Sequence, residues 1–262
     1  AHSFPTRRSS DLWYYPNLDW LIPWYVDDYI SLDSRQSTDL GRRLASLLDW
    51  HCRTQLPDYA GFLREIRRDA AEGRLGIMRF SAYNERIRGY WDIMIARIGP
   101  EVVTLMVTAS DEQIRELFDN LERENQKLEE EFVNPPDEEI VRNRQKRMEK
   151  RLGYWFSDLT DAQQRMVAAW SEQLAPISAD WIENRRKVQA EFQHLLEQRN
   201  HSEEFADAFL ALLNHPETLR SETYRAKIAI NTERTLLLLA QVSASMTPDQ
   251  LAHFDGRLES LA

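Results

Sequence analysis

The chain has 262 residues, 42% of them hydrophobic and 29% charged, and a formal net charge of -10. This composition excludes a disordered chain, and the acidic balance disfavours general binding to nucleic acid or anionic lipid. Because Cys52 is the single cysteine, an intramolecular disulfide and a cysteine-rich zinc site are also excluded.

Residues 1–12 differ in character from the rest of the chain. They lack the apolar core of a signal peptide, and the segment from Phe4 to Leu12 resembles translated sequencing adaptor. We therefore expect residues 1–12 to be an adaptor-derived or disordered tail, with the true N terminus and any export signal missing. Residues 13–262 are expected to form a single all-helical domain.

Apolar residues recur at helical spacing from the start of this domain. Between residues 18 and 30 they form one stripe, at Leu18, Leu21, Ile22, Tyr25, Val26, Tyr29 and Ile30. Further stripes lie over residues 40–51, 59–66 and 83–98. Each stripe predicts an amphipathic helix that packs on its neighbours. Gly99 and Pro100 are expected to end the last of these helices, because proline cannot continue the hydrogen-bond ladder.

The middle of the chain predicts a long charged hairpin. Residues 114–132 and the segment that opens at Asp137 both show helical patterns, and two prolines separate them. We expect these helices to pair as a hairpin near residues 110–156. The prolines also mark a candidate sub-boundary at residues 134–136.

The remaining sequence continues the helical pattern. Apolar stripes recur near residues 166–170, 181–195, 205–213, 224–242 and 251–261. Glycine is scarce, and no alternating pair of strands is recognisable. The sequence therefore predicts an all-α fold, an elongated multi-helix bundle or array.

Four of the predicted helices begin with the same short pattern. An Asp, Ser or Thr stands three residues before a glutamine at Asp33 and Gln36, Ser110 and Gln113, Thr160 and Gln163, and Thr247 and Gln250. This spacing predicts a capping box, in which the first side chain accepts from the third helical amide and the glutamine reaches back to the amide of the cap. The glutamines are spaced too unevenly for a solenoid repeat.

The copies at Thr160 and Thr247 carry a further resemblance. They resemble Leu-Thr-x-x-Gln, the hallmark of periplasmic helical proteins of the Spy and CpxP type. In that family the motif lies in a cradle-shaped helical dimer whose concave face binds unfolded clients without ATP. The resemblance implies a chaperone-like role.

The opening stretch resembles a narrower family. The matching segments are Tyr15 to Leu21, Trp24 to Tyr29, Trp50 with His51, and Gln55 to Tyr59. They resemble a family of uncharacterised bacterial lipoproteins, known only as a domain of unknown function, over the full length from about Trp13. The resemblance implies an N-terminal acylated cysteine and a periplasmic protein anchored to a membrane, with the outer membrane as the expected one. Cys52 lies too deep in the chain to be that cysteine.

Asp27, Asp28 and His51 form the best enzyme-like combination. If the first two helices pack antiparallel, the imidazole approaches the carboxylates, as a metal or acid–base site requires. The alternative is that His51 makes a buried hydrogen bond that orients the corner from Trp50 to Pro57. Because no recognised catalytic, phosphate-binding or metal-binding motif occurs, no catalytic residue, cofactor or metal is predicted.

Aromatic residues concentrate near the N-terminal end of the predicted domain. Trp13, Trp20 and Trp24 are candidates for a binding surface, since tryptophan and tyrosine offer a large contact area with a polar handle. The alternative is core packing, which the stripe spacing favours for Tyr25 and Tyr29.

Basic residues concentrate between Arg142 and Arg151. We interpret this run as a solvated helix face that forms ion pairs with the Glu-rich segment 122–131. No aromatic or loop signature accompanies the run, so nucleic-acid binding is not expected there.

Together these patterns predict a non-enzymatic protein of the cell envelope that binds other proteins, with chaperone-like activity as the sharper hypothesis. The expected partners are envelope proteins or unfolded clients, and membrane contact is expected only through a lipid anchor absent from this chain. The alternative is a metal-dependent hydrolase or metal-binding protein using Asp27, Asp28 and His51. A third hypothesis is an adaptor with a single envelope partner.

Overall fold

A computed structural model of the protein describes residues 26–200 and 204–262. Every regular element in these ranges is helical, which confirms the predicted all-α array. The elements are α3 (Ser34–Trp50), the π-helix η2 (His51–Gln55), α4 (Leu56–Ala71), α5 (Ile77–Thr108), α6 (Asp111–Phe132), α7 (Asp137–Phe156), α8 (Asp161–Gln173), α9 (Ser178–Glu197), α10 (Phe205–Asn214), the 3-10 helix η3 (Pro216–Leu219), α11 (Glu222–Ala244) and α12 (Pro248–Leu261). None of these helices combines the length and hydropathy that a membrane crossing requires.

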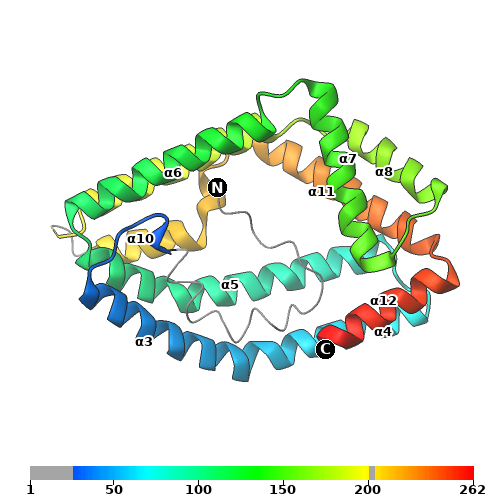
Figure 1. Ribbon diagram of the computed structural model, residues 1–262, viewed down its shortest axis with the longest axis horizontal. Coiled ribbons are helices and arrows are strands. Elements are labelled where there is room, and N and C mark those ends of the chain that lie inside the picture. The colour runs from blue at the N-terminus through cyan, green and yellow to red at the C-terminus, as the bar shows by residue number, and fades with distance from the viewer. Residues whose placement is uncertain (1–25, 201–203) are drawn as a thin grey trace.

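The described helices form an open frame (Figure 1). α6 and α9 run side by side along one edge, and α3 and α4 form the opposite edge. α7, α8 and α11 close one end, while the long helix α5 runs along the frame between its two ends. Arg64 of α4 donates to the backbone carbonyl of Ala262 over 3.1 Å, so the end of the chain lies against the α4 edge.

The packing pattern occurs twice in the chain. In the first half of the chain, α3 to α6, helix α3 packs against α5. In the second half, α8 to α12, helix α8 packs against α11 in the same way. α6 packs against α9 while α12 packs against α4, so each half places its last helix on a helix of the other. The corresponding helices α5 and α11 pack on each other. The frame therefore has an approximate two-fold arrangement in which the halves are interlocked.

Two hydrophobic cores lie in different parts of the frame. The larger core draws on α4, α5, α7, α8, α11 and α12, and it includes Phe62, Tyr83, Leu152, Val167, Leu238, Val242 and Leu258. The smaller core includes Ile30, Val103, Met106, Ile114, Leu196, Phe205 and Phe209. Each fully buried side chain of this kind contributes roughly 1.5–3 kcal/mol. Because α5 contributes to both cores, it connects them, and its middle turns lie between them.

α5 continues through Gly99 and Pro100, where the sequence predicted its end. A Cβ atom at Gly99 would lie 2.7 Å from Leu210 Cδ2, so glycine allows α10 to approach closely at this point. Val103 and Met106 beyond the proline are buried in the smaller core. The packing of the following turns outweighs the hydrogen bond that a proline removes from the helix.

α3 and α4 are joined without a loop. The π-helix η2 continues α3 directly into α4, where the sequence indicated a corner. Thr54 Oγ1 donates to the Trp50 carbonyl over 2.8 Å. The ring of His51 packs edge-on against the ring of Tyr59, with 5.5 Å between the ring centroids. A π-helical turn contains one more residue than an α-helical turn. The apolar stripe of α4 is therefore rotated about the helix axis relative to the stripe of α3.

The predicted hairpin over residues 110–156 is not formed as a packed pair. α6 packs against α9, and α7 packs against α8 and α12. The two helices diverge from their connection in Figure 1. The physical reason is that the apolar side of α7, with Met148 and Leu152, is buried in the larger core, whereas Ile114 of α6 is buried in the smaller one.

Candidate functional site

The four capping sequences meet in two pairs. Each of Asp33, Ser110, Thr160 and Thr247 caps its helix and forms a capping box with the glutamine three residues later. The starts of α3 and α6 come together at one place, and the starts of α8 and α12 come together at another. We call these the first and second glutamine corners.

In the first corner, Gln36 and Gln113 hydrogen-bond each other reciprocally. Gln113 Nε2 donates to Gln36 Oε1 over 2.7 Å, and Gln36 Nε2 donates to Gln113 Oε1 over 3.1 Å. Gln36 also donates to the Thr108 carbonyl, and Gln113 donates to the Ser31 carbonyl. Both carbonyls belong to the residue two positions before the opposite helix cap. Each glutamine thus caps its own helix and holds the chain that enters the other.

The second corner repeats this geometry with Gln163 and Gln250. Their amides exchange hydrogen bonds of 2.9 and 2.8 Å. Gln250 donates to the Asp158 carbonyl, and Gln163 donates to the Ser245 carbonyl, again two residues before the opposite caps. Gln163 and Gln250 are 0% and 2% exposed. Their hydrogen-bonding groups are used within the protein, so the corners position helices.

The exposed apolar surface of α5 lies away from both corners. Ile87, Trp91 and Ile95 follow one another at four-residue intervals and therefore share a face of the helix. Ile87 and Trp91 are 56% and 66% exposed, while Ile95 is partly buried. We call these three residues the α5 stripe. A tryptophan two-thirds exposed on a helix is unusual, since aromatic side chains are mostly buried in proteins.

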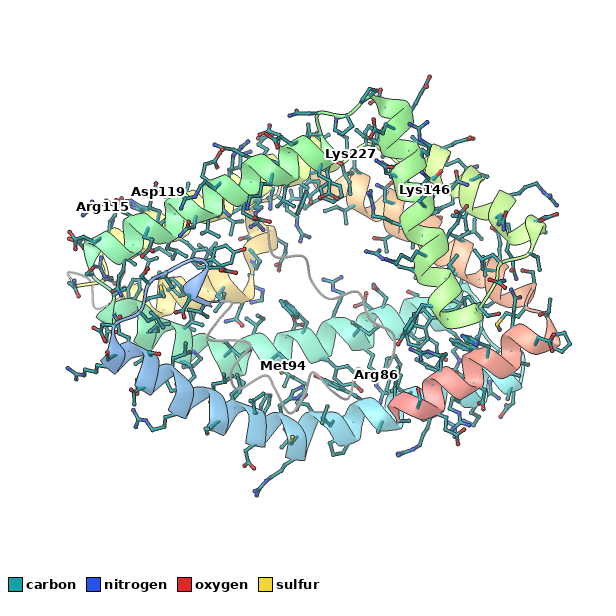
Figure 2. The ribbon with its side chains drawn as sticks, in the orientation of Figure 1. Arg86, Met94, Arg115, Asp119, Lys146 and Lys227 are labelled. Atoms are coloured by element: carbon teal, nitrogen blue, oxygen red, sulfur yellow. The ribbon has the colours of Figure 1, made fainter. Side chains whose placement is uncertain are left out.

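Among the described residues, neighbouring helices cover the two ends of this face and leave Ile87 and Trp91 exposed. At the N-terminal side, Ile87 borders a groove of about 460 Å³ that Phe80, Ile228 and Leu236 also line between α5 and α11. At the C-terminal side, α10 packs over Gly99. Arg86 lies on the other side of α5, which faces α4, and donates to Glu65 over 2.7 Å; Figure 2 marks Arg86 and Met94 along α5. The ribbon of α5 borders the opening of the frame in Figure 1.

The expected ion pairs between the basic run and residues 122–131 are not formed. Glu122 and Glu129 of α6 bind Arg186 of α9 instead, with N–O distances of 2.9 Å. The hydrogen bonds from Arg186 keep the pKa of Glu122 below its usual value. The predicted pairs are not formed because α6 packs against α9, whereas α7 packs against α8 and α12.

The structure does not bring Asp27 and Asp28 to His51. The two aspartates are exposed just before α3, whereas His51 follows its last residue. A straight helix of 17 residues separates them by roughly 25 Å. Partial burial lowers the pKa of His51. Within residues 26–200 and 204–262, no group of three or more His, Cys, Asp or Glu residues is arranged to hold a metal ion.

A buried carboxylate lies at the turn between α4 and α5. Asp69 is 1% exposed, and it accepts from the Tyr83 hydroxyl over 2.5 Å and from Arg74 over 2.6 Å. Burial raises the pKa of Asp69, but the bonds from Tyr83 and Arg74 and the charge of Arg79 outweigh burial and keep the pKa below its usual value. This carboxylate orders the turn.

The candidate tryptophans Trp13, Trp20 and Trp24 lie outside the described residues. Trp91 lies within the apolar stripe over residues 83–98, which predicts packed positions, so the sequence pattern does not predict its exposure. One signal was available: Tyr90 and Trp91 are adjacent, so they lie about 100° apart on a helix and cannot both point into one narrow core.

Residues 28–225 match a family model described as a family of unknown function (DUF6279). No curated protein and no solved structure matches the chain.

Proposed function

Because the chain belongs to DUF6279, a family of unknown function, we propose its function from geometry: it is a non-enzymatic protein that binds apolar segments of other proteins. The observation that carries this proposal is the α5 stripe. Uncovered apolar patches on soluble proteins are typical of interaction sites, and tryptophan is among the residues that contribute most to binding.

The frame suits a ligand that is extended and poorly folded. The two cores and the two glutamine corners hold the helices on either side of the stripe, so the binding surface is preorganised. The apolar groove between α5 and α11 continues from Ile87, which provides room for a second side chain of the same segment. Apolar contact without many directed hydrogen bonds favours a broad range of client sequences.

A light-scattering assay tests this activity. The purified full chain is added to reduced insulin, whose B chain aggregates, and scattering is followed with time. We expect the protein in excess to suppress scattering, and Trp91→Ser to weaken the effect about tenfold because an aromatic anchor is lost. Ile230→Ser is the matched control, since Ile230 is 43% exposed on α11 and lies outside the groove.

Two results would contradict the proposal. One is scattering that stays unchanged with excess wild-type protein; the other is equal suppression by the wild type and Trp91→Ser. Circular dichroism and urea unfolding of each variant show that it remains folded. Co-purification of one dominant partner from cells, with no effect on insulin, would instead support a single-partner adaptor.

We also propose a periplasmic, lipid-anchored location and a chaperone-like relation to the Spy and CpxP type of protein. Support comes from the Leu-Thr-x-x-Gln resemblance at Thr160 and Thr247 and from the lipoprotein resemblance of the opening stretch. The test is to express the gene from its natural start codon and to fractionate the cells. Recovery of the protein in the cytosol would contradict this location.

A further inference from the structure

α7 carries a concentration of positive charge that no carboxylate of the described residues pairs with. Within a chain of net charge -10, six cations lie close together, at Arg142, Arg144, Lys146, Arg147, Lys150 and Arg151. None of them forms an ion pair with a carboxylate of the described residues, although cations on the other long helices do: Arg67 pairs with Asp255, and Lys227 with Asp180.

The surroundings of α7 explain why these charges have no carboxylate partner in the described part of the chain. Glu122 and Glu129 are held by Arg186, and Glu149 within the run accepts from Gln145. Two of the cations have uncharged partners. Arg144 donates to the Ser171 carbonyl over 3.0 Å, and Arg147 lies 5.0 Å over the ring of Phe132. Burial and the charge of Arg147 lower the pKa of Arg144.

The exposed cations form a line on the side of the helix that faces away from the larger core. Met148 and Leu152 point into the larger core, and at 100° per residue Lys146 and Lys150 lie almost opposite them. Arg142, Lys146 and Lys150 are all exposed and follow at four-residue intervals, about 6 Å apart along the axis. We call these three residues the α7 stripe. α7, on which Figure 2 marks Lys146, stands at the edge of the frame opening.

We propose that the α7 stripe binds acidic residues of the same extended polypeptide segments whose apolar residues bind the α5 stripe. Alternate carboxylates on an extended chain stand about 6.6 Å apart, close to the spacing of the cations. This inference rests on the proposed function and adds a chemical class to it: the ligand is a segment with neighbouring apolar and acidic residues.

A polypeptide fits these observations better than a larger polyanion. The acidic remainder of the protein repels extended anionic surfaces such as nucleic acid or an anionic membrane. The run from Arg142 to Arg151 contains no aromatic side chain, whereas single-stranded nucleic acid is held largely by stacking on aromatic residues. A short acidic segment needs only local contact with the stripe.

Fluorescence anisotropy with two labelled peptides tests the proposal. One peptide combines Leu and Phe with alternate Glu residues, and the other replaces each Glu with Gln. At low salt we expect the full chain to bind the acidic peptide about tenfold more tightly than the Gln peptide. Each exposed ion pair contributes little to the binding free energy, but the contributions of three pairs add up. The double variant Lys146→Glu with Lys150→Glu is expected to remove this preference and to leave binding of the Gln peptide unchanged.

The matched control is Arg123→Glu with Lys127→Glu, which reverses two exposed cations at the same four-residue spacing on α6. The proposal would be overturned if the two double variants lost the same affinity for the acidic peptide. It would also be overturned if the wild type bound the two peptides equally. Tighter, stripe-dependent binding of an oligothymidylate or of phosphatidylglycerol vesicles would overturn it too. Failure of both peptides to bind would overturn the proposed function as well, and binding of the Gln peptide alone would leave that function standing.

Discussion

The two glutamine corners use the same contacts but differ in their exposure to water. In the second corner, Gln163 and Gln250 are 0% and 2% exposed, and the larger core surrounds them through Leu159, Met246 and Leu251. In the first corner, Gln36 is 7% exposed and Gln113 is only partly buried. A hydrogen bond lost in a dry site leaves its partner unsatisfied, whereas water replaces it in a wetter one. Identical motifs should therefore contribute unequally to stability.

The largest effect is expected from Gln163→Leu. This change removes the amide that bonds Gln250, Ser245 and the cap amide of Thr160. Because Gln163 and Gln250 are buried, and Ser245 and Thr160 are partly buried, the free energy of unfolding should fall by about 2–4 kcal/mol. Urea unfolding followed by circular dichroism measures the change. Gln164→Leu at the exposed neighbouring position is the control, and an equal loss there would refute the explanation.

A smaller effect is expected from Gln36→Leu. The same classes of hydrogen bond are lost, to Gln113, the Thr108 carbonyl and the Asp33 amide. Water reaches this corner more readily, so the free energy of unfolding should fall by about 1–2 kcal/mol. The same urea experiment measures it, with Ser37→Ala as the control. A loss as large as that of Gln163→Leu would show that burial does not separate the corners.

The smallest effect at neutral pH is expected from Glu116→Gln. Glu116 binds Ser31 of the first corner, so this change tests whether low pH destabilises the first corner and not the second. The Ser31 hydroxyl and amide donate to Glu116 over 2.6 and 2.9 Å, and these bonds lower its pKa from the usual 4.5. A lowered pKa in the folded state contributes stability above the unfolded value, and this contribution is lost as the pH falls through the folded value. The second corner is built from uncharged side chains and should not respond in this way.

Urea unfolding of the wild type and Glu116→Gln from pH 7 to pH 3 checks this expectation. The difference in unfolding free energy between them should be present at pH 7 and shrink below pH 4.5. Glu130→Gln, an exposed change on the same helix, controls for the loss of one charge. A difference that stays constant with pH would mean that Ser31 does not depend on the ionised carboxylate.

The candidate site was only partly accessible from the sequence. The α5 stripe consists of apolar residues in a helix that the pattern predicted, but their exposure depends on where α10 and α11 cross α5. The basic run was visible, and its assigned partners were wrong, because Arg186 of α9 takes the carboxylates expected for it. Asp27, Asp28 and His51 are close in sequence, yet one intervening helix keeps them apart.

The sequence by itself determined the local structure: helical stripes, their starts and the all-α class, because 3.6-residue periodicity and capping act within a few residues. Only the tertiary structure decided which starts meet. Each glutamine has a second amide face that local rules leave unassigned, and the start of another helix of the same half supplies its partner. Packing between the halves places α6 on α9 and α10 on α5, so α6 and α7 have different neighbours and α5 continues past Pro100.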